Sequence, residues 1–234
     1  MFRSPPGTAR GLDDAVARLL RDLGPQLRRG GGITSPAPPL PTGIAAIDGL
    51  LTGGMPGARL SEIAGPLSSG RTSLALCLLA RATRSGGVAA VVDAADAFDP
   101  PSAAAAGVDL ERVLWVRAPR PRAALRSAES ILNARGFALV LLDLVAEALP
   151  LPPAAGPRLA RLAAGTGTPL VALCRERSLG TAAEVVVELQ PTRANFAGTP
   201  SLLEDLEIEV ALVRHRTAPD QRTASVRLRT TRAA

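Results

Sequence analysis

Residues 65–72 have the sequence Gly65-Pro66-Leu67-Ser68-Ser69-Gly70-Arg71-Thr72. They match the phosphate-binding pattern G-x-x-x-x-G-K-[ST] at every specified position except one. In that pattern the glycines let backbone N–H groups turn toward a di- or triphosphate, and a helix that starts at the loop adds a favourable field. The lysine reaches the terminal phosphates and the hydroxyl holds Mg²⁺. In this chain the lysine position of the pattern is occupied by Arg71.

Arg71 is not an equivalent replacement, since its guanidinium is planar and longer than the compact ammonium of lysine. The chain contains no lysine, so all 27 of its Lys+Arg residues are arginine and the exchange follows a global preference. A chain selected to hydrolyse nucleotide is nevertheless expected to keep lysine at this one position. We therefore expect weak or absent hydrolysis.

The flanking sequence favours a functional phosphate loop over a Gly/Ser-rich turn without a ligand. Leu60–Ala64 is a predicted strand and Ser73–Ala82 a predicted helix, which is the strand–loop–helix arrangement that the motif requires. The predicted nucleotide-binding residues of the loop are Gly65, Pro66, Ser68, Ser69, Gly70, Arg71, Thr72 and Ser73. Of these, Thr72 is also predicted to bind Mg²⁺.

Length and composition favour one α/β core. At 234 residues and 47% hydrophobic, the chain has enough apolar sequence for one substantial domain. The formal charge of +6 is compatible with nucleic acid as a partner, but the charge is moderate. Four arginines between Arg117 and Arg126 and four between Arg222 and Arg232 suit either phosphate contacts or a solvated basic face. The second interpretation is favoured because aromatic residues are few.

The chain has no predicted secretory or membrane segment. Its N-terminus lacks an apolar h-region, and the longest apolar stretch, Phe137–Leu149, is short and carries Asp143 and Glu147. Cys77 and Cys174 lie far apart in apolar segments, which indicates reduced core thiols. We therefore expect a cytoplasmic protein.

The chain divides into a predicted N-terminal appendage and one core domain. Residues 1–40 contain an amphipathic helix at about Leu12–Leu23 and a Gly/Pro-rich linker, and residues 41–234 form the core. In the core, apolar segments alternate with helical ones, which predicts a mostly parallel central sheet with helices on both faces. Predicted strands after the phosphate loop are Val88–Val92, Val113–Val116, Ala138–Leu142 and Pro169–Cys174, and predicted helices are Ser102–Ala106 and Ala123–Ala134.

The last predicted strands are Glu184–Leu189, Leu206–Val213 and Ala224–Arg229. Their pattern is increasingly alternating, which is typical of an antiparallel extension at the sheet edge.

A set of ordered motifs accompanies the loop and identifies a family resemblance. These are Pro41-Thr42-Gly43, Gly53-Gly54-Met55-Pro56-Gly57, Glu62-Ile63, Val91-Val92-Asp93-Ala94, Phe98-Asp99-Pro100, Gly107-Val108-Asp109 and Val140-Leu141-Leu142-Asp143. With them, the segment from Pro41 to about Pro150 resembles the ATPase core of the bacterial recombinase RecA. A weaker similarity continues through Arg214-His215-Arg216. The resemblance implies a RecA-like P-loop core that uses ATP and Mg²⁺.

The resemblance also assigns roles to residues outside the loop. Asp143, at the end of a predicted strand, stands where P-loop proteins keep the carboxylate that assists Mg²⁺, although a helix cap or turn residue is the alternative. Asp99 is implied to contact the adenine amino group. Arg214 and Arg216 match basic residues that reach the nucleotide of an adjacent subunit, which implies a homo-oligomer. An exposed edge strand protected by positive charge explains these two arginines equally well.

Several family features are missing. Ala95 stands where the family has the glutamate that activates water, and alanine has no acid–base capacity. Asp96 is the nearest substitute. The chain has no tyrosine, whereas the family stacks an aromatic side chain on adenine near the position of Ser102. The segments matching the two DNA-binding loops are reduced to Leu149–Pro157 and Arg175–Gly180. Hydrolysis and DNA binding through these loops are therefore both in doubt.

A short RecA-like core with an altered site and a tethered helix resembles the ImuA group, which is also described as similar to the division inhibitor SulA. The resemblance implies an accessory protein of DNA repair in SOS translesion mutagenesis. Its partners would be a RecA filament or an error-prone DNA polymerase, with DNA as a further candidate. Two alternatives stay open: an active DNA-dependent ATPase in which Arg71 and Asp96 replace the usual groups, and a SulA-like division inhibitor.

Overall fold

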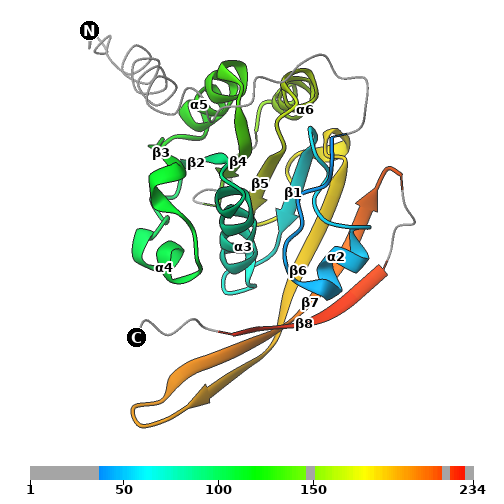
Figure 1. Cartoon of the computed structure of the whole chain (residues 1–234). Helices are drawn as coiled ribbons and strands as arrows, with labels where there is room; N and C mark the ends of the chain where they lie inside the picture. Colours follow the sequence, from blue (N-terminus) through cyan, green and yellow to red (C-terminus); the bar gives the residue numbers. More distant parts are fainter. Residues whose placement is uncertain (1–36, 146–150, 218–221, 230–234) are drawn as a thin grey trace, which may run out of the picture.

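In the part of the chain that the structure describes, eight strands form one sheet in the order β3-β2-β4-β5-β1-β6-β7-β8 (Figure 1). The computed structural model describes residues 37–145, 151–217 and 222–229. The strands are β1 (Leu60–Ala64), β2 (Val88–Asp93), β3 (Val113–Arg117), β4 (Phe137–Asp143), β5 (Leu170–Cys174), β6 (Val185–Ala197), β7 (Leu202–His215) and β8 (Arg222–Arg229). The helices are α2 (Ala45–Leu50), α3 (Arg71–Arg84), α4 (Pro100–Ala105), α5 (Pro121–Ala134) and α6 (Ala155–Thr166), with 3-10 turns η2 (Leu110–Arg112) and η3 (Gly180–Ala182).

The strands from β3 to β6 are parallel, and helices cover both of their faces. Side chains of α3 pack with Ile63 and Leu141 in one apolar cluster. Side chains of α5 and α6 pack with Leu142 and Leu170 in a second cluster on the other face. The central strands β1, β2 and β5 are buried along their whole length, which explains their almost continuous apolar sequence. The predicted fold class is therefore confirmed.

Strand β7 pairs antiparallel with both β6 and β8, and these strands extend the sheet at one edge, as predicted. The two strands β6 and β7 are much longer than their predicted cores. They continue as a two-stranded hairpin that projects beyond the helices (Figure 1). The ladder continues to the pair Ala197–Leu202, and most side chains in the outer part of β6 are exposed. Because these residues are exposed and mostly polar, they lack the apolar pattern from which the sequence analysis predicted strands.

Two helices, α2 and α6, were not predicted from the sequence. Pro157 lies in the first turn of α6, where proline is tolerated because that N–H has no partner within the helix. The prolines before Pro157 favour a loop in the sequence, so the start of α6 was not predicted. Helix α2 has only six residues, of which Ile47 and Leu50 are buried. Such a short element carries almost no periodic signal.

The described part of the N-terminal segment is attached to the core by close backbone contacts. Leu40 and Met55 exchange two backbone hydrogen bonds, with N···O distances of 2.7 and 2.8 Å. A Cβ atom on Gly54 would lie 2.3 Å from the carbonyl oxygen of Leu40, and Gly54 has a φ of +132°. The segment before the core can approach this closely only because glycine stands there. The predicted helix at Leu12–Leu23 lies outside the described residues, so the domain boundary stays a prediction.

Candidate functional site

The phosphate loop lies at the carboxyl edge of the parallel strands, where open α/β sheets bind their ligands. It follows the last residue of β1, and Gly70 adopts the left-handed conformation (φ 85°) as the N-cap of α3. A side chain at Gly70 would also clash with Leu228 of β8, since a Cβ atom would lie 2.6 Å from its methyl carbon. Thr72 and Ser73 are exposed in the first turn of α3. The loop thus presents a helix N-terminus and two hydroxyls to a ligand, as a phosphate site requires.

Arg71 turns back into the protein rather than outward. The residue is 6% exposed, and its Nη1 donates a hydrogen bond of 2.7 Å to the carbonyl oxygen of Cys174 at the end of β5. Its Nε lies 3.3 Å from the hydroxyl oxygen of Ser69, which accepts a second bond. Burial lowers the pKa of Arg71, and the negative charge of Asp143 opposes this effect. The guanidinium therefore connects the phosphate loop to β5.

Asp143 ends β4 and lies beside Asp93, the last residue of β2, in the parallel ladder. Its Oδ1 accepts a hydrogen bond from the Val145 N–H at 2.9 Å. Burial raises the pKa of Asp143, and the neighbouring Asp93 carboxylate adds to this increase, whereas Arg71 acts against it. The carboxylate lies at the edge where the resemblance places the Mg²⁺-assisting acid. The Val145 contact also matches the alternative prediction of a turn residue.

Asp93 has a structural role that sequence reasoning did not assign. It is 1% exposed and accepts three backbone hydrogen bonds, at 3.1 Å from Ala95, 3.1 Å from Ala97 and 3.0 Å from Phe98. The Trp115 indole N–H donates a fourth bond at 3.2 Å. This carboxylate orders the turn that follows β2. The missed signal was a lone aspartate at the end of an otherwise apolar strand.

Ala95 and Asp96 lie in this turn, past the end of β2. Asp96 has a positive φ of 52°, and its carboxylate forms an exposed ion pair with Arg117 at 3.0 Å. The same Arg117 lies over the Trp115 ring, 4.3 Å from its centre. Asp96 is thus paired with an arginine at the edge strand β3.

Asp99 caps the N-terminus of α4. One carboxylate oxygen accepts a hydrogen bond from the Ser102 N–H at 2.9 Å. Hydrogen bonding by the Ser102 side chain, and secondly by this N–H, lowers the pKa of Asp99. Ser102 lines a groove that also contains Ser73 of the phosphate-loop helix. The structure therefore brings α4 and the phosphate loop to one groove. The described residues that line it include no aromatic side chain.

A polar cavity of about 600 Å³ opens on the other side of the phosphate loop. Gly65 and Pro66 form one wall, and Arg175 and Arg177 line the cavity from the turn after β5. Arg177 is paired with Glu188 at 2.8 Å. These two arginines were noted in the sequence only as part of a shortened loop. Their position beside the phosphate loop depends on the ladder between β1 and β5, which no local pattern reveals.

The buried Glu62 of β1 stabilises the turn after β5 through hydrogen bonds. This residue is fully buried, and its Oε1 accepts hydrogen bonds from the backbone N–H groups of Ser178 at 2.6 Å and Leu179 at 3.2 Å. Arg71 contacts the start of the same turn through the Cys174 carbonyl. The segment that matches the family's second DNA-binding loop is therefore fixed at both ends.

Arg214 and Arg216 contact the η3 turn of their own chain. Both are near the end of β7, which pairs with the start of β6 at the opposite edge of the sheet. Arg214 Nη1 donates to the carbonyl oxygen of Gly180 at 2.6 Å, and Arg216 Nη2 donates to that of Thr181. Their predicted contact with a nucleotide on a neighbouring subunit stays a prediction.

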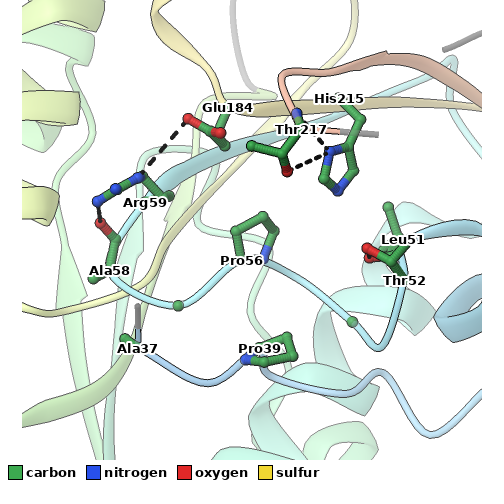
Figure 2. A pocket seen from close by; sticks show the side chains of 12 residues that line it. Ala37, Pro39, Leu51, Thr52, Pro56, Ala58, Arg59, Glu184, His215 and Thr217 are labelled. Carbon is green, nitrogen blue, oxygen red and sulfur yellow. Dashed lines mark hydrogen bonds and ion pairs between the residues drawn. The ribbon is translucent and has the colours of Figure 1, made fainter. Parts of the chain in front are cut away.

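A second cavity, of about 360 Å³, lies at this opposite edge and is lined by residues on both sides of the Gly54–Gly57 turn. Figure 2 shows His215 above it, with the Nδ1 atom 3.3 Å from both the backbone nitrogen and the hydroxyl of Thr217. Arg59 and Glu184 form an ion pair of 3.8 Å at its rim. None of the predicted nucleotide-binding residues lines this cavity.

The described residues contain no group of three or more His, Cys, Asp or Glu side chains arranged to hold a metal ion. Magnesium would therefore depend on Thr72, Asp143 and the phosphates of a nucleotide, which is how this ion is usually held in nucleotide sites. No helix in the same part of the chain is long and apolar enough to cross a membrane.

The loop, the parallel sheet and the carboxyl-edge position define a protein of the P-loop α/β class. Comparison with known proteins narrows this class. The model of the RecA N-terminal domain matches residues 15–157, which is more than half of the chain. The chain therefore belongs to the RecA N-terminal domain family.

Individual relatives agree with this assignment. Protein RecA of Rubrobacter xylanophilus is 38% identical over 145 residues, which cover 61% of this chain and 42% of that protein. Protein RecA of a Picosynechococcus species is 33% identical over 147 residues, covering 62% and 42%. The matched segment thus spans less than half the length of these relatives. A crystal structure of the RadB recombinase superimposes with a TM-score of 0.63 at 22% identity, covering 80% of this chain and 94% of that one.

Proposed function

We propose that this chain is a RecA-like accessory protein of DNA repair in SOS translesion mutagenesis, similar to the ImuA group. In this role it acts through contacts with a RecA filament or an error-prone polymerase, and its nucleotide site has lost turnover. DNA contacts are secondary, because the segments that correspond to the family's DNA-binding loops are short.

The single observation that carries this proposal is the inward position of Arg71. A residue that must contact terminal phosphates is here bonded to the Cys174 carbonyl and the Ser69 hydroxyl. Ala95 adds to the argument, since the turn after β2 has no carboxylate at the water-activating position. Binding of Mg-ATP remains compatible with the exposed Thr72 and the helix N-terminus, whereas efficient hydrolysis is not.

The test combines calorimetry with a phosphate-release assay. Mg-ATP is titrated into the purified protein with and without single-stranded DNA, and release is measured on the same samples. The proposal predicts no release above background, together with binding to a RecA filament or to an error-prone polymerase in a pull-down with purified components. Binding to neither partner would contradict the proposal.

One alternative has a specific observation in its favour. Thr72 and Asp143 both lie at the carboxyl edge, as an ATPase requires. An active DNA-dependent ATPase predicts phosphate release that single-stranded DNA stimulates and Asp143→Ala abolishes. Release that persists in the Asp143→Ala protein would exclude this alternative and indicate a contaminating enzyme.

A further inference from the structure

A groove of about 580 Å³ runs between α3 and α4 on one side and β7 and β8 on the other. We call it the α3–β8 groove. Its apolar lining includes Leu76, Cys77, Ala105, Leu203, Leu206 and Leu228. In Figure 1, α4 and the projecting β6–β7 hairpin lie on the same side of the molecule. The groove is open to solvent rather than enclosed, so an elongated ligand can enter it without a change in the fold.

The apolar surface continues from the groove onto the hairpin. Leu203 of β7 lies opposite Phe196 of β6 in the antiparallel ladder, and opposite residues point to the same face. Phe196 is 61% exposed, and the adjacent Leu202 is 54% exposed. Exposed apolar side chains grouped beside a groove are typical of a protein-interaction site.

The charged side chains that line the groove are both arginines. Arg227 and Arg229 line it, and none of its described lining residues carries a carboxylate. Arg227 forms ion pairs with Glu207 and Asp205 of β7, so Arg229 is the lining cation that an acidic group of a ligand would meet. Arg84 on α3 lies close enough to Cys77 that its charge acts to lower the pKa of the thiol, against the larger opposing effect of burial.

The lining does not suit a nucleotide base. Asp99, which the family resemblance assigns to adenine, caps α4 and is not among the residues that line the groove. The described residues that line the groove offer no aromatic ring for stacking, and leucines from β7 and β8 form the wall facing α3. Grooves that bind amphipathic segments of partner proteins instead have an apolar lining with a few charged groups.

We propose that the α3–β8 groove binds a short segment of a partner protein that combines apolar and acidic residues. The apolar side chains would contact Leu76, Leu206 and Leu228, and a carboxylate would pair with Arg229. The inference specifies the kind of partner for the accessory role proposed above, and it rests on that role. It does not depend on whether the phosphate loop binds nucleotide.

The test uses a random 12-residue peptide library displayed on phage and selected on the full-length protein. The selected peptides are then measured by fluorescence anisotropy against three variants. Ala105→Glu places a carboxylate in the groove. Ala104→Glu is the matched control, because Ala104 is exposed on the same helix and does not line the groove. Arg229→Glu reverses the charge at the groove.

We expect selected peptides to be enriched in both acidic and apolar residues. They should bind the wild type and Ala104→Glu equally, and Ala105→Glu and Arg229→Glu at least about tenfold more weakly, which corresponds to 1.4 kcal/mol. Failure of the library to enrich, enrichment in basic peptides, or equal binding to Ala105→Glu would overturn the proposal.

Calorimetry with Mg-ATP on the same variants separates this proposal from the proposed function. If Ala105→Glu lost affinity for Mg-ATP and Mg-ATP displaced the peptides, the groove would be a nucleotide-base site and the proposal would be wrong. Peptide binding that is unchanged by Mg-ATP supports it. Phosphate release by the wild type would refute the proposed loss of turnover and leave the peptide result intact.

Discussion

Arg71 connects the phosphate loop to strand β5 through its hydrogen bonds to Cys174 and Ser69. Replacing it with methionine keeps an unbranched apolar stem but removes the guanidinium and its bonds to Cys174 and Ser69. We expect Arg71→Met to lower the free energy of unfolding by about 1–3 kcal/mol, since a bond from a charged donor to a buried carbonyl is lost. Urea unfolding monitored by circular dichroism measures this loss.

The matched control for this exchange is Arg126→Met on α5, where the arginine is exposed and a change within about 0.5 kcal/mol is expected. Calorimetry adds a second readout. If Arg71 contacted phosphate rather than β5, the methionine variant would lose Mg-ATP affinity and keep its stability, which is the opposite of the expected result.

Asp93 is the residue on which the turn after β2 depends. Asparagine at this position presents an NH₂ group toward backbone N–H donors, so Asp93→Asn should lose at least two of four hydrogen bonds. We expect destabilisation of about 3 kcal/mol. Trp115, the only tryptophan in the chain, reports the change directly through its fluorescence because its N–H contacts this carboxylate. Asp96→Asn, which removes only an exposed ion pair, should change stability by less than about 1 kcal/mol.

Replacing Asp143 with asparagine should stabilise the fold at neutral pH, whereas the same exchange at Asp93 should destabilise it. Burial raises the pKa of Asp143 above its ordinary value of 3.8, so the folded state holds the proton more tightly than the unfolded state. This contribution to stability is complete below about pH 4 and is lost as the pH rises through the folded-state pKa. Asp143→Asn cannot ionise, and its amide oxygen can still accept the Val145 bond.

We therefore expect Asp143→Asn to be more stable than the wild type at pH 7 and equal to it near pH 3, in urea unfolding at both values. A variant that is less stable at pH 7 would show that the carboxylate stabilises the fold. Such a result would mean that the bond from Val145 and the charge of Arg71 outweigh burial.

The sequence predicted which residues form the phosphate loop but not the orientation of the substituted side chain. The motif correctly placed Gly70 and Thr72 at a helix start, because those positions are fixed by local backbone geometry. The contacts of Arg71 with Cys174 and of Glu62 with Ser178 join residues more than a hundred positions apart. Such contacts follow from strand order, which one sequence does not encode in any local pattern.

At the scale of elements, the segment before the core depends on glycines in the turn that precedes β1. Gly54→Ala places a methyl group 2.3 Å from the Leu40 carbonyl oxygen at a positive φ of 132°, and both effects are unfavourable. We expect a loss of at least about 2 kcal/mol in the free energy of unfolding. Gly49→Ala is the matched control, since nothing lies within 4 Å of its Cβ position in α2 and alanine favours a helix. Equal stability of the two variants would show that the contact with Leu40 is dispensable.

The elements that the sequence predicted best are those whose burial gives a periodic pattern. Strand β4 was predicted within one residue at each end because its apolar run is continuous. Helix α6 was missed because proline and glycine stand in its first turn, and α2 because it is too short. The outer part of β6 was missed for another reason, since exposed strands in a hairpin need not alternate.

At the scale of the whole molecule, the sheet has two parts that should differ in local stability. The parallel part is buried between helices, whereas the outer hairpin of β6 and β7 is largely exposed. Amide hydrogens exchange through local opening where few apolar contacts resist it. We therefore expect residues of β1, β4 and β5 to exchange only through global unfolding, and residues 192–205 to exchange at least about a hundredfold faster, in hydrogen exchange read by mass spectrometry.

A peptide selected for the α3–β8 groove gives this experiment a second comparison. It should slow exchange in the segment around Leu203 and Leu206 and leave β4 unchanged, because it would contact the hairpin and not the centre of the sheet. The Ala105→Glu protein should show the same exchange as the wild type without peptide and no slowing with it. Uniform protection of hairpin and sheet in the free protein would contradict the expected difference between the two parts. Slowing in β4 as well would mean that the peptide stabilises the whole fold rather than one edge of it.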